Sequence, residues 1–184
     1  MLFRLHCPCC NSVSSSWSNV ATTPPLPAFL GCVSSNDQAA DLLAEQSWVA
    51  CTICGTVFLR ELIEPEILYQ GAHATSAGGI WDEHHREFAA FLAEHASTLD
   101  GSILEVGGGV GKLAASFRAL GQATTWEIMA ANPPLEGSLL PGVSYFPGLF
   151  GPDTPARGHA SIVFSHCLEH VFDLRGVVKN IASA

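Results

Sequence analysis

Apolar and polar residues follow a regular pattern in the second half of the chain. An apolar run at residues 102–106 predicts a buried strand, and beyond a glycine-rich turn Leu113, Ala114, Phe117 and Leu120 recur at helical spacing. Later patterns predict strands at residues 123–128, 143–145 and 161–164, and a helix at residues 171–181. This alternation is typical of a doubly wound α/β fold with a parallel sheet.

The first half of the chain has shorter and less regular patterns. Residues 80–96 place their apolar side chains on one helical face, which predicts a helix. Residues 46–59 predict short strands. Residues 11–36 are rich in Ser, Thr, Asn and Pro, and the prolines at positions 24–27 exclude regular helix, so this stretch predicts a long loop.

The turn after the first predicted strand carries the most informative motif, Glu105-Val106-Gly107-Gly108-Gly109-Val110-Gly111. Its glycines permit unusual backbone angles and a close approach of a ligand to the backbone. A dinucleotide fingerprint needs glycine where Lys112 stands, and a phosphate loop needs glycine and Ser or Thr where Val106 and Leu113 stand. The remaining pattern resembles the first motif of class I S-adenosylmethionine-dependent methyltransferases. The alternative is a glycine-rich turn that binds no ligand.

Cysteines predict a second site near the N-terminus. Four of the seven form two Cys-x-x-Cys pairs, Cys7 with Cys10 and Cys51 with Cys54, each followed by a turn-forming residue. Two such turns supply the four sulfurs of a tetrahedral, structural zinc site with no open position for a substrate. The pairs lie about 40 residues apart, which is more than the roughly 15–20 of common zinc modules. The alternative is a redox dithiol or buried thiols, and Cys32 and Cys167 are predicted to be buried thiols.

Composition limits the classes of partner. The chain has 184 residues, 48% of them apolar, and a net charge of −9 from 17 acidic residues against 8 Lys and Arg. This charge leaves no basic surface for a phosphate backbone, so nucleic acid is not an expected partner. Neither a membrane-spanning run nor a secretory signal is present in the pattern, which favours a cytoplasmic protein without a membrane partner.

The predicted fold is therefore α/β with a small zinc-knuckle module in front. Residues 1–78 form this module with its Ser/Pro-rich loop, and residues 79–100 form a bridging helix. Residues 101–184 form the N-terminal half of a Rossmann-like, S-adenosylmethionine-binding sheet. Four predicted strands are fewer than a complete methyltransferase sheet contains, so we expect the chain to be a C-terminally truncated fragment whose remaining strands are missing.

Several residues are expected to contact the cofactor. Glu127 is predicted to end the second strand, where an acid can accept hydrogen bonds from both ribose hydroxyls, although a solvated acid is the alternative. The resemblance to methyltransferases implies that Glu105 lies near the methionine end of the cofactor and that Phe150 frames adenine. It also implies that Ser165 and His166, after the fourth strand, face the transferring methyl group.

His170 lies in the same segment after the fourth strand. Imidazole titrates near physiological pH, so His170 is a candidate general base. The alternative is that Glu169 and His170 open the next helix, where an acid interacts favourably with the helix dipole.

The order of the motifs resembles one family in particular. Twin cysteine knuckles, a helix, the Glu105–Gly111 turn and Leu168-Glu169-His170-Val171 resemble the zinc-binding sugar C-methyltransferases. The resemblance implies that a base, matching His170, removes a proton beside the keto group of a nucleotide-linked sugar, and that the enolate takes the methyl group. Where that family has a second tyrosine after Tyr69, this chain has Ala72 and His73.

Two other functions remain open at this point. A zinc-containing ribosomal RNA methyltransferase also places cysteines before this fold, but the acidic charge and the distance between the knuckles count against it. A non-catalytic truncated scaffold, in which the zinc module contacts other proteins, is the other alternative.

Overall fold

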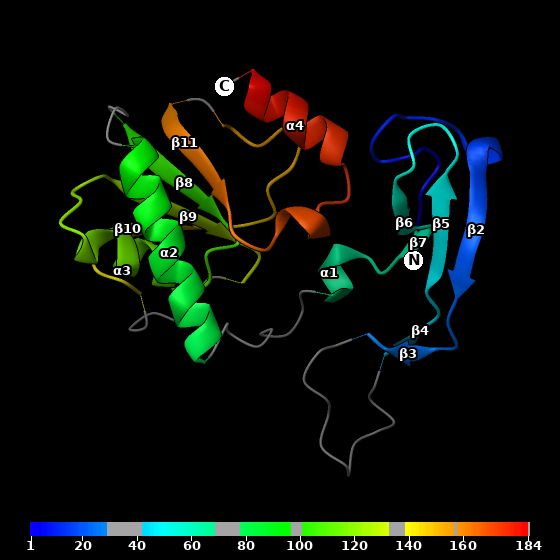
Figure 1. Cartoon of the computed structure of the whole chain (residues 1–184), viewed down its shortest axis with the longest axis horizontal. Coiled ribbons are helices and arrows are strands. Elements are labelled where there is room, and N and C mark those ends of the chain that lie inside the picture. Colours follow the sequence, from blue (N-terminus) through cyan, green and yellow to red (C-terminus); the bar gives the residue numbers. More distant parts are fainter. Residues whose placement is uncertain (29–41, 69–77, 97–100, 133–138, 157, 184) are drawn as a thin grey trace, which may run out of the picture. The chain divides into compact units, whose positions relative to one another are not determined.

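The chain forms two compact units, Met1–Ala74 and Thr75–Ala184. A computed structural model describes residues 1–28, 42–68, 78–96, 101–132, 139–156 and 158–183 (Figure 1). Cys32, Tyr69, Ala72 and His73, which the sequence analysis singled out, lie outside the described residues. Within those residues, no helix has the length and apolar character needed to cross a membrane.

The first unit consists of short antiparallel strands. Its largest sheet has the order β2-β5-β6. These strands are Trp17–Thr22, Ser47–Cys51 and Val57–Leu59. Two-residue strands pair beside it, β1 (Leu2–Phe3) with β7 (Glu61–Leu62) and β3 (Leu26–Pro27) with β4 (Leu43–Ala44). A 3-10 turn, η1 (Ser14–Ser16), and a short helix, α1 (Pro65–Leu68), complete the unit.

Strand β2 corrects the prediction of one long loop at residues 11–36. Five of its six residues are exposed, so its sequence lacks the alternation that reveals a half-buried strand. The strand forms because its backbone pairs with β5, from Trp17 opposite Cys51 to Thr22 opposite Ser47. The short strands predicted at residues 46–59 are confirmed as β5 and β6.

In the part of the first unit that the structure describes, the apolar core is very small. Its buried members are Cys7, Val49, Cys51 and Phe58, and the Trp17 ring packs edge-on against Phe58 with ring centroids 5.0 Å apart. Two of these four residues are cysteines. So small an apolar core gives a unit of this size little stability, and proteins of this kind usually need a metal or disulfides in addition.

The second unit contains a four-stranded parallel sheet with the order β10-β9-β8-β11 (Figure 1). The strands are β8 (Ser102–Val106), β9 (Trp126–Ala130), β10 (Val143–Pro147) and β11 (His159–Phe164). From β8 the chain continues to β9 and then to β10 on one side of β8, and β11 then pairs with β8 on its other side. The predicted Rossmann-like parallel sheet is confirmed, and its strand order reverses between β8 and β11, where open sheets of this kind bind ligands.

Helices cover both faces of this sheet. On one face α2 (Gly79–Ala96) and α3 (Lys112–Ala119) pack over Ile103, Trp126 and Ile128. On the other face α4 (Leu174–Ala182) packs over Leu104 and Val106. Helix α2 is thus part of the second unit, in which it packs against α3.

The boundaries of several elements differ from the predicted ones. Strand β8 occupies the predicted residues 102–106, but β9 begins at Trp126 instead of residue 123. The last helix begins at Leu174, after a 3-10 turn, η3 (Leu168–His170). Asp173 caps α4, and its carboxylate accepts a hydrogen bond from the Gly176 N–H at 2.9 Å. The alternative in which Glu169 and His170 open this helix is therefore wrong.

Candidate functional site

The two cysteine turns of the first unit have the same backbone geometry. The Cys7 N–H donates to the Ser12 carbonyl at 2.8 Å, and the Cys51 N–H donates to the Thr56 carbonyl at 2.9 Å. Asn11 and Gly55 each donate their N–H back to the first cysteine of the turn. Both have positive φ, 65° and 76°. Asn and Gly tolerate this conformation better than other residues, which explains why they follow the two pairs.

These turns bring the four sulfurs together. The Sγ atoms of Cys7, Cys10, Cys51 and Cys54 all lie within 4.8 Å of one another. Cys7 and Cys54 are separated by 3.6 Å, and Cys10 and Cys51 by 3.5 Å. A tetrahedral ion with metal–sulfur bonds of about 2.3 Å separates its ligands by about 3.8 Å. The cysteine group could therefore hold a metal ion such as zinc.

Neighbouring hydroxyl groups favour the thiolate forms that a metal requires. Hydrogen bonds from the Thr56 side chain and backbone lower the pKa of Cys54 to about 6. The Ser12 hydroxyl, 3.0 Å from the Cys51 sulfur, lowers the pKa of Cys51. Burial raises the pKa of Cys7 to about 11, so this thiol depends most on a bound cation to become ionised.

In the second unit, the glycine turn lies at the carboxyl end of β8 and is packed closely on three sides. A Cβ on Gly107 would lie 2.9 Å from the Cys167 Cβ, and a Cβ on Gly111 would lie 2.9 Å from the Tyr145 hydroxyl. A Cβ on Gly108 would lie 2.5 Å from the Glu105 carboxyl carbon. Only glycine fits these positions without movement of a neighbour.

Glu105 lies beneath this turn and is 1% exposed. Its carboxylate accepts a hydrogen bond from the indole N–H of Trp126 at 2.8 Å. Burial raises the pKa of Glu105 to about 7, and the Trp126 bond opposes this shift. Gly108 covers Glu105. A cofactor whose methionine end lay near this carboxyl would therefore be separated from it by the loop backbone.

The segment after β11 borders the same turn. Phe164 pairs with Val106, and the Cys167 thiol donates to the Val106 carbonyl at 2.9 Å. Burial raises the pKa of Cys167 to about 12, so this thiol is a neutral group; the sequence predicted it to be buried, and it is partly buried. Ser165 and His166 lie between Phe164 and Cys167, directly after β11, the fourth strand of this sheet along the chain.

Sequence analysis missed two residues of α2 that meet this segment. The Trp81 and His166 ring centroids are 5.0 Å apart, and the His84 Nε2 atom lies 2.9 Å from the Ser165 Oγ. Helical periodicity identified Trp81 only as part of an apolar face. A pairing of residues 81 positions apart leaves no local signal, although polar His84 beside an apolar stripe is unusual enough to have suggested a buried partner.

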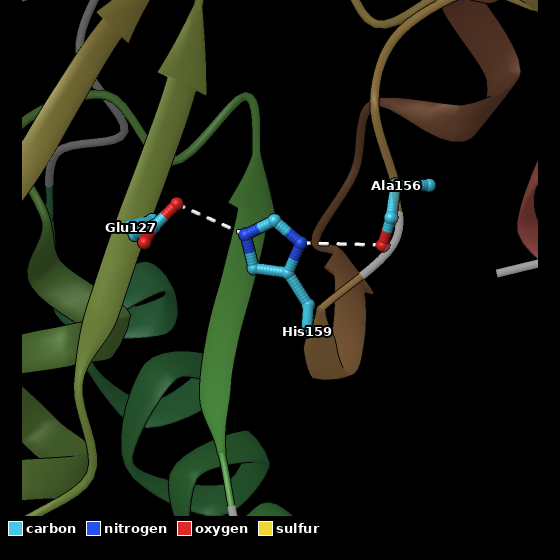
Figure 2. Close-up of polar contacts among 3 residues, drawn as sticks. All are labelled: Glu127, Ala156 and His159. Atoms are coloured by element: carbon cyan, nitrogen blue, oxygen red, sulfur yellow. Dashed lines mark hydrogen bonds and ion pairs between the residues drawn. The ribbon is translucent and has the colours of Figure 1, made fainter.

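Glu127 does not occupy its predicted position at the end of the second strand. It is the second residue of β9, which continues to Ala130. Its carboxylate bonds to the Nε2 of His159 at 2.9 Å, while the Nδ1 of His159 lies 3.3 Å from the Ala156 carbonyl oxygen (Figure 2). The prediction failed because Thr124 and Thr125 suggested an early start for the strand. This pair ties β9 to the start of β11, which does not support a ribose contact.

Two further predicted residues have clear positions. Phe150 is 6% exposed and packs edge-on against Phe164 with ring centroids 5.6 Å apart. It is therefore a core residue, and its role beside adenine stays a prediction. His170 is exposed at the end of η3, where a general base would be accessible to a substrate.

No protein-family model matches the chain, and no curated protein matches it. The function must therefore be inferred from the residues of the site.

The buried Glu105 carboxyl predicts a specific dependence of stability on pH. Because its folded pKa is raised to about 7 from 4.5, the folded state keeps a proton that the unfolded state has lost between these values. The free energy of unfolding should fall by about 3 kcal/mol as pH rises through this interval. Urea unfolding of the wild type and of Glu105→Gln, at pH 5 to 8, measures this difference and cancels contributions shared by both proteins. Parallel stability curves would contradict the assignment.

Proposed function

We propose that the chain is an S-adenosylmethionine-dependent methyltransferase whose cofactor lies on the Glu105–Gly111 turn. The observation that carries this proposal is the buried Glu105 carboxyl beneath Gly108, at the carboxyl end of the central strand. When bound, the cofactor supplies a methyl group on a positively charged sulfur.

Charge distinguishes this cofactor from a dinucleotide. The buried Glu105 carboxyl under the turn has a pKa of about 7, so at pH 7 it carries a partial negative charge, which repels the phosphates of NAD and attracts the ammonium and sulfonium groups of S-adenosylmethionine. The nearest lysine does not compensate, because the Lys112 ammonium is paired with Asp82 at 3.0 Å. That pair lines a shallow hollow between α2 and α3, together with His85, Arg86, Ala115 and Ser116. The Glu105 charge and the Lys112–Asp82 pair agree with the spacing of the glycines in the loop, which departs from the dinucleotide and phosphate-loop patterns.

Asn132 replaces Glu127 as our candidate for the ribose contact. Ligands of open α/β sheets lie beyond the carboxyl ends of the strands, and an acidic or polar side chain after the second strand bonds the ribose hydroxyls. Strand β9 ends at Ala130, and Asn132 is the first polar residue beyond it, exposed to solvent. An amide offers both a donor and an acceptor to a pair of hydroxyl groups.

The proposed substrate is a nucleotide-linked keto-sugar that is methylated at carbon. This finer proposal rests on the resemblance in motif order, from the twin knuckles to Leu168–Val171. In it, His170 accepts the proton from the carbon beside the keto group, and the electron pair stays on the substrate. The exposure of His170 in the segment after β11 supports this role.

For the first unit we propose a structural zinc ion bound by Cys7, Cys10, Cys51 and Cys54. The four-sulfur donor set and the matched turns support zinc, and a site filled by four protein ligands has no position for a substrate. The ion would add the stability that the small core of this unit does not provide.

Gly108→Ala tests the cofactor proposal. The new methyl group must displace either the loop or the Glu105 carboxyl, so the affinity for S-adenosylmethionine should fall by about 10-fold or more. Calorimetry should show that the wild type binds this cofactor and its demethylated product, and that it does not bind NAD. Gly79→Ala is the matched control, because no heavy atom lies within 4 Å of the added group there and the backbone of Gly79 has no positive φ. Tight binding of NAD by the wild type would reverse the proposal.

Asn132→Ala and Glu127→Ala separate the two candidate ribose contacts. The loss of hydrogen bonds to the ribose should weaken cofactor binding in Asn132→Ala by about 1 kcal/mol, or about 5-fold. Glu127→Ala should leave cofactor affinity unchanged and lower thermal stability, because its partner is His159. The opposite pattern in the two titrations would restore Glu127 as the ribose ligand.

Cys51→Ser tests the metal centre. Wild-type protein should contain about one zinc ion per chain by elemental analysis, and the variant should lose most of it and unfold its first unit. Cys9→Ser is the matched control, because Cys9 lies in the same turn as Cys7 and Cys10 but outside the sulfur cluster, and it should retain its zinc. A fully folded wild-type protein that lacks metal would exclude the zinc.

A further inference from the structure

Three rings from two distant segments meet beside the glycine turn, and we call them the ring cluster: Trp81, His84 and His166. The His84 and His166 centroids are 4.6 Å apart, and those of Trp81 and His166 are 5.0 Å apart at an interplanar angle of 84°. The bond between His84 Nε2 and Ser165 Oγ, at 2.9 Å, fixes the cluster to the end of β11. Helix α2 thereby supplies a wall of aromatic and imidazole rings at the carboxyl edge of the sheet.

The backbone at His166 is strained, and this conformation sets the position of the His166 ring. His166 has φ of 53°, in the left-handed region that a residue with a Cβ seldom adopts. Such a conformation costs about 1–3 kcal/mol and persists only where the surrounding structure imposes it. Here it follows directly after Ser165 and places the exposed His166 ring against Trp81.

The cluster lies at one particular end of the glycine turn. Gly107 abuts Cys167, the residue after His166, whereas Gly111 abuts Tyr145 of β10. In sheets of this strand order the nucleoside points toward the second strand, here β9. The opposite end of a ligand on the turn must then point toward β11, where the ring cluster lies. In S-adenosylmethionine that end carries the sulfonium and the amino acid group.

We propose that the ring cluster receives the sulfonium end of the cofactor and that the Trp81 ring attracts its positive charge. This inference rests on the proposed cofactor. An indole face attracts a cation through its quadrupole, and the demethylated product S-adenosylhomocysteine is neutral at sulfur. The cluster thus distinguishes the methyl donor from its product, which helps the product to leave.

The surroundings of the cluster are compatible with a cation. His85, whose ring centroid lies 5.5 Å from that of His84, has its pKa lowered by burial and is therefore neutral at pH 7. The side chain of Phe88, at a centroid distance of 5.8 Å from His84, adds another aromatic ring behind it. The nearby Lys112 is neutralised by Asp82. Arg86, which lines the hollow with His85 and Lys112, is exposed to solvent.

Calorimetric titration with S-adenosylmethionine and S-adenosylhomocysteine tests the inference on the full chain. In Trp81→Leu, affinity for the charged donor should fall by about 5- to 30-fold, while affinity for the neutral product changes by less than about 2-fold. Trp81→Phe should give an intermediate loss for the donor only. Phe91→Leu, an exposed aromatic position further along α2, is the matched control and should bind both ligands as the wild type does.

Each outcome has a distinct meaning. An equal loss for both ligands in Trp81→Leu would make the ring a shape contact and overturn the inference, as would unchanged affinity for both. If Trp81→Leu does not fold, as judged by circular dichroism, Trp81→Phe alone decides by the ratio of the two affinities. Failure of the wild type to bind either ligand would overturn the proposed cofactor itself, and this inference with it.

Discussion

The second unit depends on the contact between a buried carboxyl and a glycine without a side chain. Glu105 ends up beneath Gly108 because β8 directs its side chain into the layer between the sheet and α3, where the Trp126 indole is the hydrogen-bond donor. A carboxyl in this place leaves no room for a Cβ at Gly108 in the loop above it. The turn therefore lies close to the carboxyl edge of the sheet, and a ligand can approach the backbone of the turn.

Contacts on either side of that loop connect it to the rest of the sheet. The Tyr145 hydroxyl of β10 donates to the Val110 carbonyl at 3.3 Å and accepts the Leu140 N–H at 3.2 Å. On the other side, Cys167 closes against Gly107. Strands on both sides of β8 thus fix one loop, and the imidazole and indole rings from α2 extend its border. The first unit follows a different principle, because two matched turns and their sulfurs replace an extensive apolar core.

Local sequence patterns correctly predicted those elements whose structure depends on neighbouring residues in the chain. The run at residues 102–106 is apolar and ends at glycine, so β8 was predicted at its observed bounds, and the turn residues Asn11 and Gly55 identified both cysteine knuckles. Strand β2 was missed because exposed residues carry no alternation. Glu127 was misplaced because strand register depends on partners that are distant in the sequence. The Trp81 and His166 contact is of the same kind.

The central claim is that S-adenosylmethionine or its product lies on the Gly107–Gly111 turn at the border with β11. Nuclear magnetic resonance of the ¹⁵N-labelled chain, titrated with S-adenosylhomocysteine, tests it most directly. The account predicts that amide resonances of Gly107–Gly111, Asn132 and Ser165–Cys167 shift, and that those of the cysteine knuckles do not. Shifts confined to other residues, such as those lining the hollow between α2 and α3, or no shifts at millimolar ligand, would contradict it.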